Sequence, residues 1–283
     1  MTNLMTHGDD GRSPDRGRKR ESGPAGDVAS ATVGGSDRLV VDALGVGTVS
    51  SGASGTGGVG GMDLASVAEA ARAVKPKLRG WIHAGAFLPA VAAGIVLICL
   101  APNAGDAAAC TVFAVSSWLL FGVSGIYHRG TWGPRWAAVL RRLDHTNIFL
   151  IIAGTYTPLS VMILPARSAG ILLSVVWSGA LIGIGMRVFW LGAPRWLYVP
   201  CYLALGWAAV FFMPQFLHYG GVAVLVLIIT GGVLYSVGAV VYGTKKPDFS
   251  PRWFGFHELF HVFTIAAFVC HYIAVSMVAY SQA

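Results

Sequence analysis

Two histidines with a glutamate between them, at the start of the last long apolar stretch, are the residues most suggestive of chemistry. They form the run HELFH, from His257 to His261. Residues four apart on an α-helix lie on one face, so the two imidazoles could bind one metal ion. With its glutamate, the run also matches the H-E-x-x-H pattern of zinc proteases. The source of a third ligand therefore decides which kind of site this is.

The residues that follow His261 do not complete a protease site. No Asp or Glu follows it, and the longer pattern H-E-x-x-H-x-x-G-x-x-H would need glycine and histidine where Thr264 and Ala267 stand. His271 is ten residues further on, which is about 15 Å along a helix and too far to reach the same ion. The third ligand is therefore expected from another helix.

The composition indicates a membrane protein. The 283 residues are 55% hydrophobic and 12% charged, whereas an ordinary soluble domain is about 25% charged. From residue 80 onward, the acidic residues are Asp106, Asp144, Asp248 and Glu258. The net charge of +7 is interpreted as Lys and Arg retained on the cytoplasmic side. No nucleic-acid partner is expected.

Seven apolar stretches are long enough to cross a bilayer, which takes about 20 residues each. We therefore predict an all-α fold, a seven-transmembrane helix bundle in the cell's inner (plasma) membrane. Gly- and Pro-containing breaks such as HRGTWGPRW and WLGAPRW separate the stretches. The predicted spans are residues 81–101, 107–128, 142–164, 168–189, 196–216, 220–243 and 254–279.

Basic residues between the stretches predict the orientation. With a cytoplasmic N-terminus, the outside loops keep only Arg167, and the C-terminus lies outside. The cytoplasmic loops then hold Arg129, Arg135, Arg141, Arg142, Arg187, Arg195, Lys245, Lys246 and Arg252.

The chain before the first span is predicted to lie outside the membrane domain. Residues 1–61 are rich in Gly, Ser, Ala and Asp and are predicted to be a disordered tail. Residues 62–79 form an amphipathic interfacial segment, and residues 80–283 the membrane domain. Translation from Met62 is a further hypothesis, because the recognisable part of the protein starts just after it.

In this topology, polar groups from three spans converge at the cytoplasmic face. His128 ends the second span, Asp144 opens the third, and His257 and His261 lie in the first turns of the seventh. His128 is thus the best-placed third ligand, and Ser124 lies one turn deeper on the same stripe. Three histidines and one water make a tetrahedral catalytic zinc site, and a carboxylate in reach could orient that water or take its proton.

Three blocks in order resemble the hemolysin III family, which belongs with the adiponectin and progestin receptors in one seven-span superfamily. They are SGIYH (Ser124–His128), LRRLDHTNIFLIIAGTYTP (Leu140–Pro158) and HELFHVFTIAAFVCHY (His257–Tyr272). The resemblance runs from about Lys75 to Ser276.

This resemblance implies a zinc ion held by His128, His257 and His261, with Asp144 and Ser124 close to its bound water as catalytic residues. The last motif of the family is H-x-x-x-H, without a required glutamate. Glu258 is therefore interpreted as incidental.

Other polar residues have plainer interpretations. His83, His145 and His218 are predicted to be interfacial polar groups, and His145 is expected to point away from the ion because it neighbours Asp144. His271 is expected to hydrogen-bond within the bundle. Asp144 itself could instead pair with Arg141 or Arg142.

Three functions stay open at this point. The first is a zinc-dependent hydrolase of lipid amide or ester bonds, similar to the ceramidase activity known of eukaryotic relatives, with a membrane lipid as partner. The second is a membrane-damaging or pore-forming protein, although the spans contain few charges to line an aqueous pore. The third is a ligand-sensing protein with a structural zinc. The sequence does not name the substrate or the oligomeric state.

Overall fold

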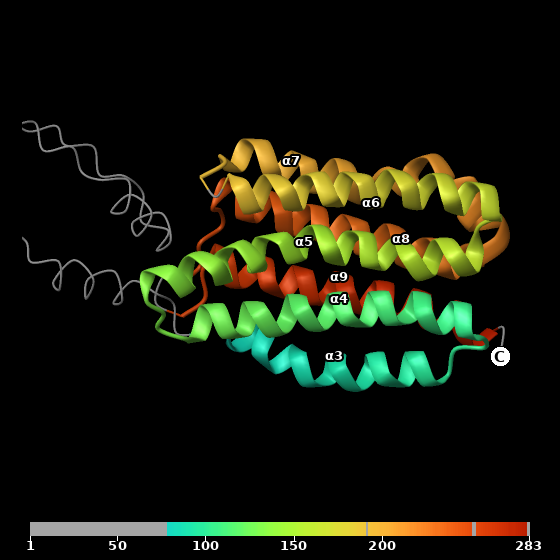
Figure 1. Cartoon of the computed structure of the whole chain (residues 1–283), viewed down its shortest axis with the longest axis horizontal. Coiled ribbons are helices and arrows are strands. Elements are labelled where there is room, and N and C mark those ends of the chain that lie inside the picture. Colours follow the sequence, from blue (N-terminus) through green and yellow to red (C-terminus); the bar gives the residue numbers. More distant parts are fainter. Residues whose placement is uncertain (1–77, 191, 251–252, 282–283) are drawn as a thin grey trace, which may run out of the picture.

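The structure is a computed structural model that describes residues 78–190, 192–250 and 253–281, and these residues form a bundle of long α-helices (Figure 1). Apart from one isolated bridge between Ser250 and Phe254, they contain no β-structure, so the all-α prediction is confirmed. The predictions for residues 1–61, and for 62–79 up to residue 77, lie outside the described residues. The helices are α3 (Trp81–Cys99), α4 (Ala104–Arg129), α5 (Pro134–Ile163), α6 (Ala166–Phe189), α7 (Arg195–Gly206), the 3-10 helix η1 (Ala208–Phe212), α8 (Met213–Thr244) and α9 (Phe256–Ser281).

Six helical stretches in the described part of the chain are long and apolar enough to cross a membrane. Helices satisfy their own backbone polar groups, which is what a lipid environment requires. The fifth stretch, Arg195–Thr244, combines α7, η1 and α8, where the sequence predicts two spans. Within it, Gly221 has φ 80° and ψ 171°, a conformation that glycine adopts without the steric cost of a side chain. The regular helix is therefore interrupted at Gly221.

One helix begins earlier than the hydropathy pattern predicts. The third span is predicted from residue 142, but α5 starts at Pro134. Proline is favoured in the first turn of a helix, because its missing N–H has no partner there in any case. Asp144 consequently lies more than two turns inside α5. The prediction that it opens this helix is wrong.

Helix α9 has a central place in the bundle. Consecutive helices pack side by side in the pairs α3 with α4, α4 with α5, α5 with α6, and α8 with α9, and α9 also contacts α3 and α5. Between α4 and α9, the rings of Phe113 and Phe121 lie 5.5 and 5.1 Å from the ring of Phe268. The end of α4 and the start of α9 lie at the same end of the bundle (Figure 1). This end carries the candidate site.

Candidate metal centre and cavity

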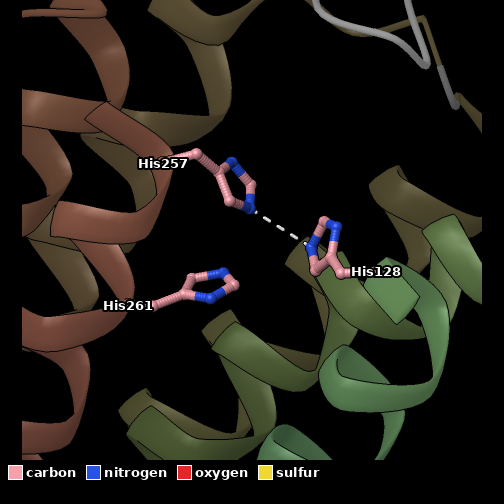
Figure 2. A group of neighbouring side chains, drawn as sticks. All are labelled: His128, His257 and His261. Carbon is pink, nitrogen blue, oxygen red and sulfur yellow. Dashed lines mark hydrogen bonds between the residues drawn. The ribbon is translucent and has the colours of Figure 1, made fainter. Parts of the chain in front are cut away.

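Three histidines from two helices meet at this end of the bundle. Figure 2 shows His128 projecting from α4 toward His257 and His261 on α9. One potential ligand atom from each lies within 4.8 Å of the other two. His128 and His261 are buried and His257 is half-buried. The structure thus brings together the three residues predicted as metal ligands.

The closest contact in this cluster is between two like atoms. Nε2 of His128 and Nε2 of His257 are 3.2 Å apart. Two neutral imidazoles meet in this way when one donates a hydrogen bond to the other, or when both direct a lone pair at a common cation. Either arrangement requires side chains that are held in place, and burial in the bundle provides this.

The other two predicted site residues flank the histidines. Oδ2 of Asp144, on α5, lies 3.6 Å from Nε2 of His128. Ser124 lies one turn before His128 on α4, is 1% exposed and is within interaction range of the Asp144 carboxylate. No described arginine pairs with Asp144; the side chain of Arg142 donates instead to the Val188 carbonyl. The alternative of an Asp144 pair with a neighbouring arginine is therefore not what the structure shows.

A fourth histidine, His83, belongs to this cluster and is not the interfacial group that the sequence predicts. It is 2% exposed, and its ring stacks on that of His261 with centroids 3.8 Å apart and planes 9° apart. Its position near the start of α3 places it at the correct end of the bundle. The sequence signal was a histidine near the start of the first predicted span. Only helix packing shows that its ring turns inward.

Glu258 is neither a candidate base nor an idle residue. It is fully buried, and its carboxylate accepts hydrogen bonds from Nε of Arg79 at 3.0 Å and from the backbone N–H of Gly255 at 2.9 Å. It does not line the cavity described below. Interpreting Glu258 as incidental is thus wrong in one respect, because it ties the segment before α3 to the start of α9.

The other histidines of the described residues lie apart from the three-histidine cluster. His145 contacts the Arg141 carbonyl through Nδ1 at 2.7 Å and the Tyr242 hydroxyl through Nε2 at 3.4 Å, so it points away as expected. His271 contacts the Ile228 carbonyl at 3.2 Å, which confirms a hydrogen bond inside the bundle. His218 is exposed.

A cavity of about 1580 Å³ opens beside the histidines and continues between the helices. It is lined along α5 from Asp144 to Leu159, a length of roughly 22 Å at the rise of an α-helix. Near the histidines its walls carry Asp144, Arg187 and several tyrosines, and deeper walls are mainly apolar. The deeper lining includes Ile148, Ile152, Leu159, Leu203, Met213, Phe216 and Ile228.

A bundle of membrane-crossing helices with a histidine cluster at the mouth of a deep cavity defines a class of integral membrane protein with a candidate metal centre. Residues 71–272 match the family model described as "Haemolysin-III related". The chain belongs to this family of multi-pass membrane proteins.

Two named relatives agree with this placement. A hemolysin-3 homolog of Bacillus subtilis (strain 168) is 34% identical over 196 residues, which cover 66% of this chain and 88% of the relative. The hemolysin-3 of Bacillus cereus is 32% identical over 185 residues, covering 64% of this chain and 80% of the relative. All the candidate site residues lie inside the matched region.

Proposed function

We propose that this protein is a zinc-dependent hydrolase of lipid amide or ester bonds that works at the cytoplasmic side of the membrane. The observation that carries the proposal is the meeting of three imidazoles, a carboxylate and a hydroxyl at the mouth of a deep, largely apolar cavity. The ligands would be His128, His257 and His261. Asp144 and Ser124 would act on the reacting groups.

The donor set fits zinc. Three neutral imidazoles are a frequent ligand set of catalytic zinc, which leaves one position for water or substrate. Two imidazole nitrogens on one tetrahedral zinc ion are about 3.3 Å apart for Zn–N bonds of about 2.0–2.1 Å. The separation of 3.2 Å between His128 and His257 is close to this value. When bound, zinc would polarise the scissile carbonyl and acidify a water molecule.

Asp144 is the proposed general base. Its carboxylate is half-buried beside His128, on a helix that supplies no metal ligand. It can therefore accept a proton from the attacking water and return it to the departing amine or alcohol. Ser124 can donate a hydrogen bond to Asp144 and so hold the carboxylate in position.

The cavity supports a lipid as the substrate. Its volume exceeds the roughly 300–1,000 Å³ of a typical small-molecule site, and its length of roughly 22 Å along α5 suits an extended hydrocarbon chain. Apolar side chains such as Ile152 and Phe216 line its deeper part. A substrate carbonyl at the mouth would lie beside the histidines while its chain occupies the interior.

The proposal includes seven crossings with the N-terminus in the cytoplasm. The break at Gly221 divides the stretch Arg195–Thr244 into segments of roughly 39 and 36 Å, each longer than the hydrocarbon core of about 30 Å. The end of the bundle that carries the site also carries Arg129, Arg135, Arg141 and Lys246, among other basic residues. Arg167, in the first turn of α6, lies at the opposite end. This asymmetry supports a cytoplasmic site in the plasma membrane.

The relatives are named hemolysins, and this name raises membrane damage as an alternative function. The apolar walls of the deeper cavity give less support to an aqueous pore than to a lipid site. A ligand sensor with a structural zinc would have the same ligands and no turnover.

The test is metal analysis of the purified full-length protein combined with lipid hydrolysis. The protein would be incubated with N-acyl amide and acyl ester lipids in neutral detergent, and released fatty acid would be measured by mass spectrometry. We expect one zinc per chain and release of fatty acid that stops on chelation and returns with zinc. A zinc-loaded protein that cleaves none of these lipids would refute the proposed hydrolase function. If the same protein made dye-filled vesicles leak, the membrane-damaging function would then be favoured.

A further inference from the structure

An arginine buried in the cavity wall has no described partner for its charge. Arg187, in the last turn of α6, is 2% exposed, and its Nε and Nη1 atoms are buried without hydrogen-bond partners. No carboxylate of the described residues lies within 4.0 Å of it; Asp144 is placed beside His128 instead. An unpaired charge is costly to bury and, in a membrane domain, marks a functional candidate.

The residues around Arg187 hold its side chain in place but do not provide hydrogen-bond partners for Nε and Nη1. Its guanidinium carbon lies 4.4 Å from the centre of the Tyr198 ring, a cation–π contact, while Nε and Nη1 have no hydrogen-bond partners. The Tyr198 ring is itself buried, 4% exposed as a residue. Arg187 also lines the same cavity as the histidines. The structure therefore places in the cavity wall a guanidinium that is held by an aromatic ring and has two donor atoms without hydrogen-bond partners.

A chain of two tyrosines connects the Arg187 guanidinium to the candidate metal centre. The hydroxyls of Tyr198 and Tyr242 are 3.3 Å apart, and the ring of Tyr242 lies 5.8 Å from that of His257. Two tyrosines thus separate the Arg187 guanidinium from a proposed metal ligand.

We propose that Arg187 is the anion-binding subsite of the cavity and holds the carboxylate or phosphate group of a single-chain amphiphile. A guanidinium pairs with the two oxygens of such a group through parallel, charge-assisted hydrogen bonds. The hydrocarbon chain would lie along the apolar walls near Ile152 and Phe216. This inference rests on the proposed function in one respect, because it takes the cavity as a lipid site. It adds the class of lipid, which is one that carries an oxyanion.

The experiment compares three probes with the same chain and different heads: hexadecanoate, hexadecyl phosphate and the uncharged hexadecanol. Binding to the purified full-length protein in neutral detergent would be measured with radiolabelled probes. Wild type should bind at least one anionic probe about 10- to 100-fold more tightly than the alcohol, the scale of a charge-assisted hydrogen bond. Arg187→Gln should lose this preference and bind all three probes alike.

The matched control is Arg167→Gln, because Arg167 is exposed at the opposite end of the same helix; it should keep the full preference. If Arg187→Gln does not fold, Arg187→Lys provides the test, because it keeps the charge but loses the two-pronged geometry, and its preference should fall to an intermediate value. Equal affinity of wild type for charged and uncharged probes would overturn the proposal. So would an unchanged preference in Arg187→Gln.

Two further arms separate the sources of the anion and the two proposals. Inorganic phosphate should displace hexadecyl phosphate only weakly; displacement as strong as that by the amphiphile itself would show a free-phosphate site and overturn the proposal. His128→Ala, which removes a proposed metal ligand, should retain the preference for anionic probes. Loss of the preference there, with retention in Arg187→Gln, would mean that the metal centre holds the head group. Lipid hydrolysis is scored separately, so an inactive protein with an intact anion preference refutes only the hydrolase.

Discussion

Nε2 of His128 and Nε2 of His257 face each other at 3.2 Å, although 129 positions separate the two residues along the chain. The contact joins the last turn of α4 to the first turn of α9. No local sequence rule places these two atoms together, and the packing of both helices is needed to do so.

Removal of any one of the three clustered histidines should release the metal. His128→Ala, His257→Ala and His261→Ala should each lower the zinc content from one per chain to well below half, because each loses one of three protein ligands. Zinc would be measured by mass spectrometry after gel filtration. His271→Ala is the control, because its imidazole contacts the Ile228 carbonyl rather than the cluster. Full zinc content in any of the three cluster variants would contradict the assignment.

Asp144→Asn should separate metal binding from catalysis. The substitution keeps the size of the side chain and removes its ability to accept a proton. We expect normal zinc content and folding, with lipid hydrolysis reduced by roughly 10²–10⁴-fold, the usual contribution of a general base. Fatty-acid release under saturating substrate would measure it. Wild-type turnover in Asp144→Asn would remove this residue from the mechanism.

Glu258→Gln should affect stability rather than chemistry. The buried carboxylate accepts from Arg79 and Gly255, and glutamine loses the charge that strengthens both bonds. We expect a loss of about 1–3 kcal/mol in the free energy of unfolding, seen as a lower Tm, with hydrolysis and zinc retained. The double variant with Arg79→Gln should cost less than the sum of the two single variants, because the pair acts as a unit. A folded, zinc-loaded but inactive Glu258→Gln would restore the zinc-protease interpretation.

Gly80→Ala should disturb the candidate metal site, although Gly80 is not one of its proposed ligands. Gly80 has φ 81°, and a Cβ there would lie 2.9 Å from Cβ of His128. The left-handed conformation would destabilise an alanine by about 1–2 kcal/mol, and its Cβ would press against the end of α4. We expect a lower Tm and weaker zinc retention in a chelator competition. Gly85 lies inside α3, and a Cβ there meets nothing within 4 Å. Gly85→Ala should therefore retain zinc and should not lower Tm, because alanine favours a helix more than glycine does. Equal losses of Tm and of zinc in the two variants would contradict a specific effect of Gly80.

The orientation can be checked by labelling single cysteines from each side of the membrane. The exposed Cys99 and Cys201 would first be replaced by serine. Cysteines at Pro134 and Lys246 should then react with an impermeant reagent only from the cytoplasmic side, and a cysteine at Tyr219 only from outside. The reverse pattern would place the site outside the cell and undo the proposed use of cytoplasmic lipid. If the cysteines at positions 219 and 246 reacted from the same side, the prediction of seven crossings would be contradicted.

Local features of the chain were readable from sequence because their causes are local. The fourfold spacing of His257 and His261 places them on one helix face whatever surrounds them, and apolar length identifies membrane-crossing segments. The start of α5 was predicted eight residues late, because hydropathy does not register the first two turns of this helix, which carry Arg135 and Arg141.

Contacts between helices were decided by tertiary structure alone. The stack of His83 on His261, the bond from Arg79 to Glu258 and the burial of Arg187 each depend on how a helix is rotated about its axis. In a helix that is apolar on nearly every side, hydropathy periodicity is weak and does not specify that rotation. The rotation of each helix is specified instead by small residues, which let neighbouring helices approach closely, and by side-chain packing. The sequence by itself therefore determined which residues could bind a metal and at which end of the bundle, and only the packed bundle decided which of them face one another.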